Sequence, residues 1–256
     1  MSLLVMRLFL NTAVMLCLLC LQACSTPEPT RIVESPQSPS LTQTNPFSWN
    51  NSHWQHLVLP SKKQTHYTLG HQQGRDAVQA RATASASMLR RDLQIAAVDL
   101  DVVKFSWHVP ELIRDADLAQ RDFDDSPVRI VLIFDGDKSK FSVKNAMLSE
   151  MAEVLSGESL PYATLMYVWC NQRAPGSIIH NPRTDRIRKM VVESGGKNLN
   201  QWLDYERNIQ ADFERAFGEA PGALVGVALM TDSDNTRSKT RAYYGPISMR
   251  TFAAAR

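Results

Sequence analysis

The sequence predicts a mostly β domain, and two patterns support that prediction. Most apolar segments beyond residue 50 are short, and they either alternate with polar residues or form continuous runs, as strands of a sandwich core do. Only two segments place apolar residues at helical spacing. Because strands and helices do not alternate regularly along the chain, a parallel βαβ architecture is disfavoured.

The strands are predicted from alternation and from apolar runs. The clearest is 103–109, where four apolar residues alternate with polar ones until Pro110 ends the pattern. The segment 80–86 alternates Ala with polar residues and predicts a strand or, because Ala favours helices, a helix. Further strands are expected over 54–59, 65–69, 128–134, 165–170, 187–192, 224–230 and 241–249.

Two segments predict helices packed on the sandwich. The first is 142–155, with apolar residues at Met147, Met151, Val154 and Leu155. The second is 208–217, with apolar residues at Ile209, Phe213, Ala216 and Phe217. Gly218 follows the second segment and is a typical helix end.

Composition excludes several classes of protein. The chain has 256 residues, of which 44% are hydrophobic and 21% charged, with 28 Lys and Arg against 26 Asp and Glu. These values exclude a disordered chain and a polybasic nucleic-acid binder, so we expect no nucleic-acid partner. Three of the four cysteines lie in the first 24 residues and leave only Cys170 in the rest, which excludes a disulfide scaffold.

The N-terminus predicts export and lipid anchoring. Arg7 is followed by a largely apolar run over 8–21, which is typical of a signal peptide and too short for a membrane span. The run ends in Leu-Gln-Ala-Cys24, which resembles the lipobox of bacterial lipoproteins. That resemblance implies cleavage before Cys24 and acylation of its thiol, and Ser25 implies sorting to the outer membrane, facing the periplasm or the surface. The alternative is an ordinary signal peptide with a chance cysteine.

Three regions follow from these patterns. Residues 1–23 form the predicted signal peptide, and 24–46 form a lipidated Cys and flexible linker rich in Ser, Thr, Pro and Gln. Residues 47–256 are long enough for a single well-buried domain. Removing the signal peptide leaves a nearly neutral chain, so its membrane attachment is expected to come from lipid.

Several stretches of this domain resemble a bacterial family catalogued as domain of unknown function 3047. They are Asp124 to Arg129, Tyr167 to Trp169, Arg207 to Glu219 and, above all, Met230 to Thr236. The resemblance spans about 54–249. It implies an exported bacterial protein whose fold is a jelly-roll-like antiparallel β-sandwich, of the kind that carbohydrate-binding modules use.

Two acidic groups are candidates for a site. The first, after a predicted buried strand, offers oxygen ligands of the kind that Ca²⁺ prefers, at Asp232, Asp234, Asn235 and Thr236. The alternative is a structural turn whose charges pair with Arg207 or Arg129. The second group includes Asp124 and Asp125, which would act with Asp232 or Asp234 as an acid and base pair if they met in space. A solvated loop or a buried ion pair is the competing interpretation.

Aromatic residues are candidates for a sugar platform. Trp202, Tyr205, Tyr243 and Tyr244 stand in polar surroundings, where a flat ring can stack on a sugar. Trp107 and Trp169 follow strand patterns and are expected in the core. The leading hypothesis is therefore an outer-membrane-anchored, non-catalytic, ligand-binding β-sandwich, with a glycan as the suggested ligand. The alternatives are a glycosidase-like envelope hydrolase that uses the paired Asp residues, and a structural or protein-interaction component of the envelope.

Overall fold

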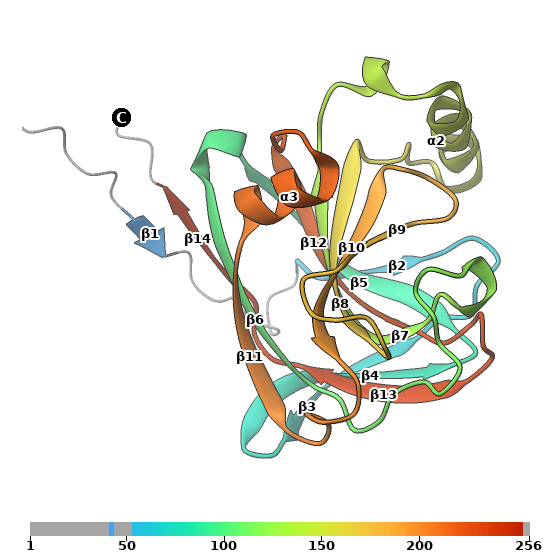
Figure 1. Cartoon of the computed structure of the whole chain (residues 1–256), viewed down its shortest axis with the longest axis vertical. Helices are drawn as coiled ribbons and strands as arrows, with labels where there is room; N and C mark the ends of the chain where they lie inside the picture. The colour runs from blue at the N-terminus through green and yellow to red at the C-terminus, as the bar shows by residue number, and fades with distance from the viewer. Residues whose placement is uncertain (1–40, 44–52, 253–256) are drawn as a thin grey trace, which may run out of the picture. The chain divides into compact units, whose positions relative to one another are not determined.

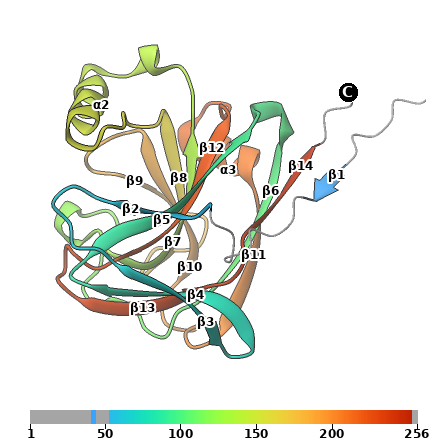
Figure 2. The ribbon, with the colours of Figure 1, turned by 180° about the vertical axis from the view of Figure 1, so that it is seen from behind.

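The computed structural model describes residues 41–43 and 53–252, which all belong to the compact unit Pro39–Arg256 (Figures 1 and 2). The predicted signal peptide, Cys24 and most of the predicted linker lie outside the described residues. Within that linker, Leu41–Gln43 form strand β1, which pairs antiparallel with β14 (Ser248–Phe252). Main-chain pairing of this kind needs no apolar side chains, which is why composition does not reveal it.

Two seven-stranded sheets form the domain. The first has the order β1-β14-β6-β13-β4-β3, with β11 also paired to β6. Its other strands are β6 (Leu100–His108), β13 (Lys239–Tyr244), β4 (Arg75–Thr83), β3 (His66–Gln72) and β11 (Trp202–Asn208).

The second sheet has the order β2-β5-β12-β7-β8-β10-β9. Its strands are β2 (Gln55–Val58), β5 (Ala86–Ile95), β12 (Leu224–Asp232), β7 (Ser126–Phe134), β8 (Ala163–Cys170), β10 (Ile187–Ser194) and β9 (Ile178–His180). Among the described strands, β8 and β10 are the one parallel pair. All other pairings are antiparallel.

The main core lies between the sheets, as the alternation of β7 shows. Ile130, Leu132 and Phe134 point inward and are fully buried in this core, together with Trp107 and Trp169. The prediction of a mostly β sandwich with packed helices is confirmed.

A second apolar cluster covers the opposite, outer face of the second sheet. Val131 on β7, Met166 on β8 and Ala228 on β12 belong to it. Leu118, from the connection between β6 and β7, packs on this face and is 2% exposed. The central strands of this sheet are therefore apolar on both faces.

Three strand predictions differ from the structure. The predicted segment 80–86 spans the end of β4 and the start of β5, which belong to different sheets: β4 ends at Thr83, and Ala84 adopts a φ of 45° before β5 begins. The segment 241–249 divides into β13 and β14 at Gly245, where an added Cβ would lie 2.1 Å from the Oγ of Ser106. Strand β11 was not predicted, although its alternation of Leu203 and Tyr205 with acidic residues is a strand signal.

Helix α3 (Ile209–Phe217) confirms the prediction for 208–217. The Asn208 side chain accepts a hydrogen bond from the backbone N–H of Ala211 (2.8 Å), and Gly218 ends the helix with a φ of 73°. Phe213 is fully buried in the main core, where its ring centroid lies 4.7 Å from that of Phe134. The short 3₁₀ helices are η1 (Ala97–Asp99), η2 (Arg121–Phe123) and η3 (Lys138–Lys140).

Helix α2 (Val143–Ser156) forms where it was predicted, but its packing differs. The apolar residues expected to face the sandwich are more than half exposed: Met147 (61%), Met151 (57%), Val154 (85%) and Leu155 (64%). The buried residues are Asn145 and Ser149 instead.

Polar contacts hold α2 in place. Thr184 donates its hydroxyl proton to the side-chain oxygen of Asn145 (2.8 Å), and the Asn145 amide donates to Asp185. The backbone N–H of Leu160 donates to the hydroxyl of Ser149 (3.2 Å). These bonds fix the polar side of α2 against the segment before β10, and they leave much of its apolar side exposed to solvent.

Candidate functional site

The two acidic groups singled out in the sequence meet at one end of the second sheet. Asp125 precedes β7, Asp232 ends β12 and Asp234 lies in the turn that follows. Side-chain oxygens of these three residues all lie within 4.8 Å of one another. The pairing of β7 with β12 causes this meeting, because it sets Ser126 opposite Asp232.

Three cations complete this group, which we call the charge cluster: Lys62, Asp124, Asp125, Arg129, Lys189, Asp232 and Asp234. The buried Arg129 places its Nη2 atom 3.2 Å from a carboxylate oxygen of Asp124 and 3.2 Å from one of Asp232.

Two lysines of the charge cluster were not predicted. The Nζ atom of Lys189, which is fully buried on β10, lies 2.5 Å from the Asp124 carboxylate and donates to the carbonyl of Leu118 (2.8 Å). Lys62 pairs with Asp234. A single lysine inside the apolar run 187–192 is a signal for a buried charge, because a buried ammonium needs a partner.

Asp125 organises the turn after β12. Its carboxylate accepts hydrogen bonds from the backbone N–H groups of Asn235 (3.2 Å) and Thr236 (2.7 Å) and from the Thr236 hydroxyl (2.5 Å). The Asn235 side chain donates to the carbonyl of Arg121 (3.1 Å). These bonds fix the turn to the segment that precedes β7.

Burial and neighbouring charges shift pKa values within the charge cluster. Burial raises the pKa of Asp232 well above its usual value, and the nearby Arg129 only partly offsets this effect. Burial would also raise the pKa of Asp234, but hydrogen bonds from Asp232 and Lys62 outweigh it and lower that pKa. Burial, followed by repulsion from Arg129, lowers the pKa of Lys189 to about 8.

The charge cluster has the chemistry of a structural ion-pair network. Asp124, Asp232 and Asp234 are engaged by cations, and Asp125 by N–H and O–H donors. Arg129 and Lys62 already supply the positive charge that a calcium ion would bring, so the donor set favours ion pairing over a metal. Calcium binding by Asp232, Asp234, Asn235 and Thr236 stays a prediction.

Arg207 lies apart from the charge cluster. Its Nε atom donates to Asp212 on α3 (2.8 Å), which also accepts a hydrogen bond from the hydroxyl of Tyr167 (3.0 Å). The structure therefore pairs Arg129, and not Arg207, with the acidic turn.

The four aromatic candidates do not form one platform. Tyr244 is fully buried and donates to the carbonyl of Met230 (2.7 Å), while Tyr243 is 7% exposed and accepts from Gln79 (2.8 Å). Tyr205 stacks on Phe105 in the core, with 5.4 Å between ring centroids. Trp202 is half-buried, and its indole N–H donates to the carbonyl of Gln72 (2.9 Å).

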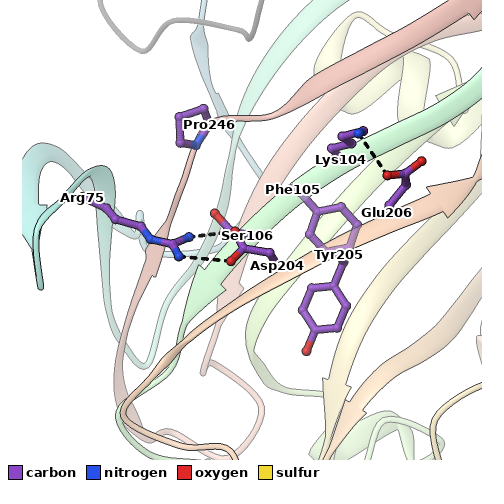
Figure 3. A pocket seen from close by; sticks show the side chains of 8 residues that line it. All are labelled: Arg75, Lys104, Phe105, Ser106, Asp204, Tyr205, Glu206 and Pro246. Carbon is purple, nitrogen blue, oxygen red and sulfur yellow. Dashed lines mark hydrogen bonds and ion pairs between the residues drawn. The ribbon is translucent and has the colours of Figure 1, made fainter.

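A polar depression of about 480 Å³ lies on the first sheet, over β6 and β11 (Figure 3). Two ion pairs cross it: Arg75 with Asp204 (2.7 Å) and Lys104 with Glu206 (3.0 Å). The guanidinium of Arg75 also lies over the ring of Trp202, 5.2 Å from its centroid.

A larger groove of about 630 Å³ lies between α2 and the outer face of the second sheet. We call it the α2 groove. Its apolar lining comes from β2 and the segment after it, from β5, β7, β8, β10 and β12, and from α2. It includes Leu57, Leu59, Met88, Val131, Ile133, Leu148, Met151, Leu155, Met166, Ile187 and Val225.

Charged residues lie at the rim of the α2 groove. Arg90 pairs with Glu158 (2.7 Å) and with Asp92 (2.7 Å), which links β5 to the segment after α2. Lys138 and Arg183 also line the groove. This groove is not predictable from local sequence patterns, because its lining comes from many elements that lie far apart in the sequence.

Removing Arg129 should destabilise the fold strongly. The variant Arg129→Met leaves Asp124 and Asp232 buried with less compensation, so the free energy of unfolding should fall by about 3–5 kcal/mol. The control is Lys104→Met, which breaks a half-exposed pair with Glu206 and should cost no more than about 1 kcal/mol. Urea unfolding measures the free energy of unfolding of both variants. An Arg129→Met protein as stable as the Lys104→Met protein would contradict the interpretation of the charge cluster as a structural ion-pair network.

Over residues 41–43 and 53–252, no helix is long and apolar enough to cross a membrane. No curated protein matches the chain.

Three similar solved structures are those of a carbohydrate-binding module and of two xyloglucanases. A family 11 carbohydrate-binding module from Clostridium thermocellum, in complex with a β-1,3-1,4-mixed-linked tetrasaccharide, is 8% identical, with 82% of this chain and 94% of that chain covered and a TM-score of 0.41. A family 12 xyloglucanase from Bacillus licheniformis is 7% identical, with 82% and 100% covered and a TM-score of 0.42. The xyloglucanase domain of NopAA from Sinorhizobium fredii, in complex with cellobiose, is 8% identical, with 77% and 92% covered and a TM-score of 0.41.

Likenesses at this level give no basis for transferring a ligand or an activity to this chain. The family model described as "Protein of unknown function (DUF3047)" matches residues 52–248, which is most of the sequence. The chain therefore belongs to the DUF3047 family.

Proposed function

We propose that this protein is an outer-membrane lipoprotein whose β-sandwich domain binds a ligand without catalysis, and that the ligand binds in the α2 groove. The observation that carries the proposal is the groove itself, a largely apolar cavity of about 630 Å³ with a few charged residues at its rim. Small-molecule sites in proteins typically have volumes of about 300–1,000 Å³ and this kind of lining.

The exposed apolar residues of α2 support the same site. Met151 and Leu155 line the groove, and more than half of each side chain is exposed to solvent. Val143 and Val154, on the same helix, are 80% and 85% exposed. Contiguous exposed apolar surface marks interaction sites, and a ligand in the groove would cover part of it.

The acidic residues that line the groove favour binding over catalysis. Asp135 accepts a hydrogen bond from the backbone N–H of Gly136 (2.8 Å), and Glu158 pairs with Arg90. The hydrolase hypothesis would use Asp124, Asp125, Asp232 and Asp234. These residues do not line the groove, and they are engaged in the charge cluster.

A neutral apolar reporter tests the groove. N-phenyl-1-naphthylamine should gain fluorescence on binding, and Met151→Glu should weaken its binding at least tenfold, because the change puts a carboxylate in the apolar lining. Met147→Glu is the matched control, since Met147 is equally exposed on the same helix but does not line the groove. Equal binding by the two variants, or no binding by the unaltered protein, would overturn the groove proposal.

The lipid anchor is tested on Cys24 directly. Cells fed a fatty-acid analogue should label the protein, and Cys24→Ser should abolish the label, because the thiol at that position is the proposed acylation site. Cys170→Ser is the control, since Cys170 is buried in β8. Label that persists in the Cys24→Ser protein would refute the anchor.

A glycan is a second candidate ligand, at the polar depression. The favouring observation is the half-buried Trp202, which does not line the depression but lies next to Arg75, which does. Arg75 and Asp204 offer polar groups for a sugar there, and the Trp202 ring offers an aromatic surface beside them. On a glycan array, the unaltered protein should bind, and Trp202→Ala should abolish that binding. If the unaltered protein gives no more signal on the array than the Trp202→Ala protein, the glycan hypothesis is wrong.

A further inference from the structure

We propose that the α2 groove takes a single aliphatic chain that ends in an anionic group, as a fatty acid or a lysophospholipid does. This inference rests on the proposed function, because it names the ligand class of the same site. Two features of the groove carry it: the chemistry of its lining and the charge at its rim.

The lining fits an aliphatic chain better than a sugar. Most of the side chains that line the groove from the sheet and from α2 are aliphatic or thioether groups, with Arg90, Thr164 and Ser156 as the polar exceptions. Phe134 is the one aromatic residue among those that line it, and that side chain is fully buried against Phe213 between the sheets. A sugar ring would find no flat face to stack on there.

Methionines make the lining adaptable. Met88 on β5, Met151 on α2 and Met166 on β8 contribute unbranched, flexible thioethers from three sides of the groove. Such side chains adjust to chains of differing length and shape. We therefore expect the groove to select its ligand by the length of the aliphatic chain and not by the exact shape of that chain.

The rim favours an anionic head. Arg90 is neutralised by Glu158 and Asp92, and Asp135 is bound to a backbone N–H. The Lys138 ammonium contacts only a neutral hydroxyl, that of Ser159 (2.8 Å), among the described residues. The Arg183 guanidinium has no ion pair within 53–252. Among the described lining residues, two cations, Lys138 and Arg183, thus stand outside ion pairs against one carboxylate, that of Asp135.

A chain-length series tests the aliphatic part. Octanoate, decanoate and dodecanoate are titrated into the protein by calorimetry, and Kd should fall about fourfold for each added methylene until the groove is filled. Dodecanoyl lysophosphatidylglycerol, tested beside dodecanoate, shows whether a lipid or a free fatty acid is the better source of the chain. A Kd that does not change with chain length would overturn the inference.

Two ligands with the same chain and opposite head-group charges test whether the rim prefers an anionic head. Dodecanoate should bind at least threefold more tightly than dodecyltrimethylammonium, and the double variant Lys138→Gln/Arg183→Gln should remove that preference while keeping the dependence on chain length. The control is Lys104→Gln/Arg75→Gln, which removes two cations from the polar depression. A preference for the cationic head, or one that the first double variant leaves intact, would overturn the anionic part.

The two proposals fail in different ways. If the neutral reporter binds the groove but the chain-length series is flat, the groove is a ligand site and the aliphatic inference is wrong. If the reporter does not bind and Met151→Glu has no effect, the groove itself is not a ligand site.

Discussion

The outer face of the second sheet is apolar, and the need to cover it shapes much of this domain. Val131, Met166 and Ala228 point away from the main core on three adjacent strands. A sheet that is apolar on both faces needs a layer on each side. The first sheet covers the inner face. The outer face is shared by the segment between β6 and β7 and by helix α2.

These two structures cover the outer face by different means. At the end with the charge cluster, Leu118 packs on the sheet, and its carbonyl accepts a hydrogen bond from the buried Lys189. Arg129 joins the segment before β7 to the end of β12 there. At the other end, α2 is held by Asn145 and Ser149, so its apolar side chains do not close on the sheet and the α2 groove remains. The proposed binding site follows from this incomplete cover.

Much of the fold is predictable from the sequence, since alternation and apolar runs locate β6, β7, β8, β10 and β12 within a few residues. Local patterns also locate both helices. They fail where the answer depends on tertiary contacts: the spacing of Met147 and Met151 predicts an apolar face but not which side of α2 meets the sheet.

The sites show the same division. Asp125 and Asp232 stand out in the sequence as acidic residues, but only the pairing of β7 with β12 brings them together. Only the structure shows that Arg129 pairs with Asp232 and that Asp125 accepts hydrogen bonds from Thr236. The α2 groove is not predictable from local patterns, because α2 and strands that lie far apart in the sequence build it together.

The central claim is that a ligand enters between α2 and the second sheet, and methionine NMR tests it most directly. With ¹³C-methyl methionine, saturating dodecanoate should shift the signals of Met88, Met151 and Met166, which line the α2 groove. The signals of Met190 and Met249, which lie in the core between the sheets, should stay unchanged. Unchanged groove methionines, or shifts confined to the core pair, would contradict the account.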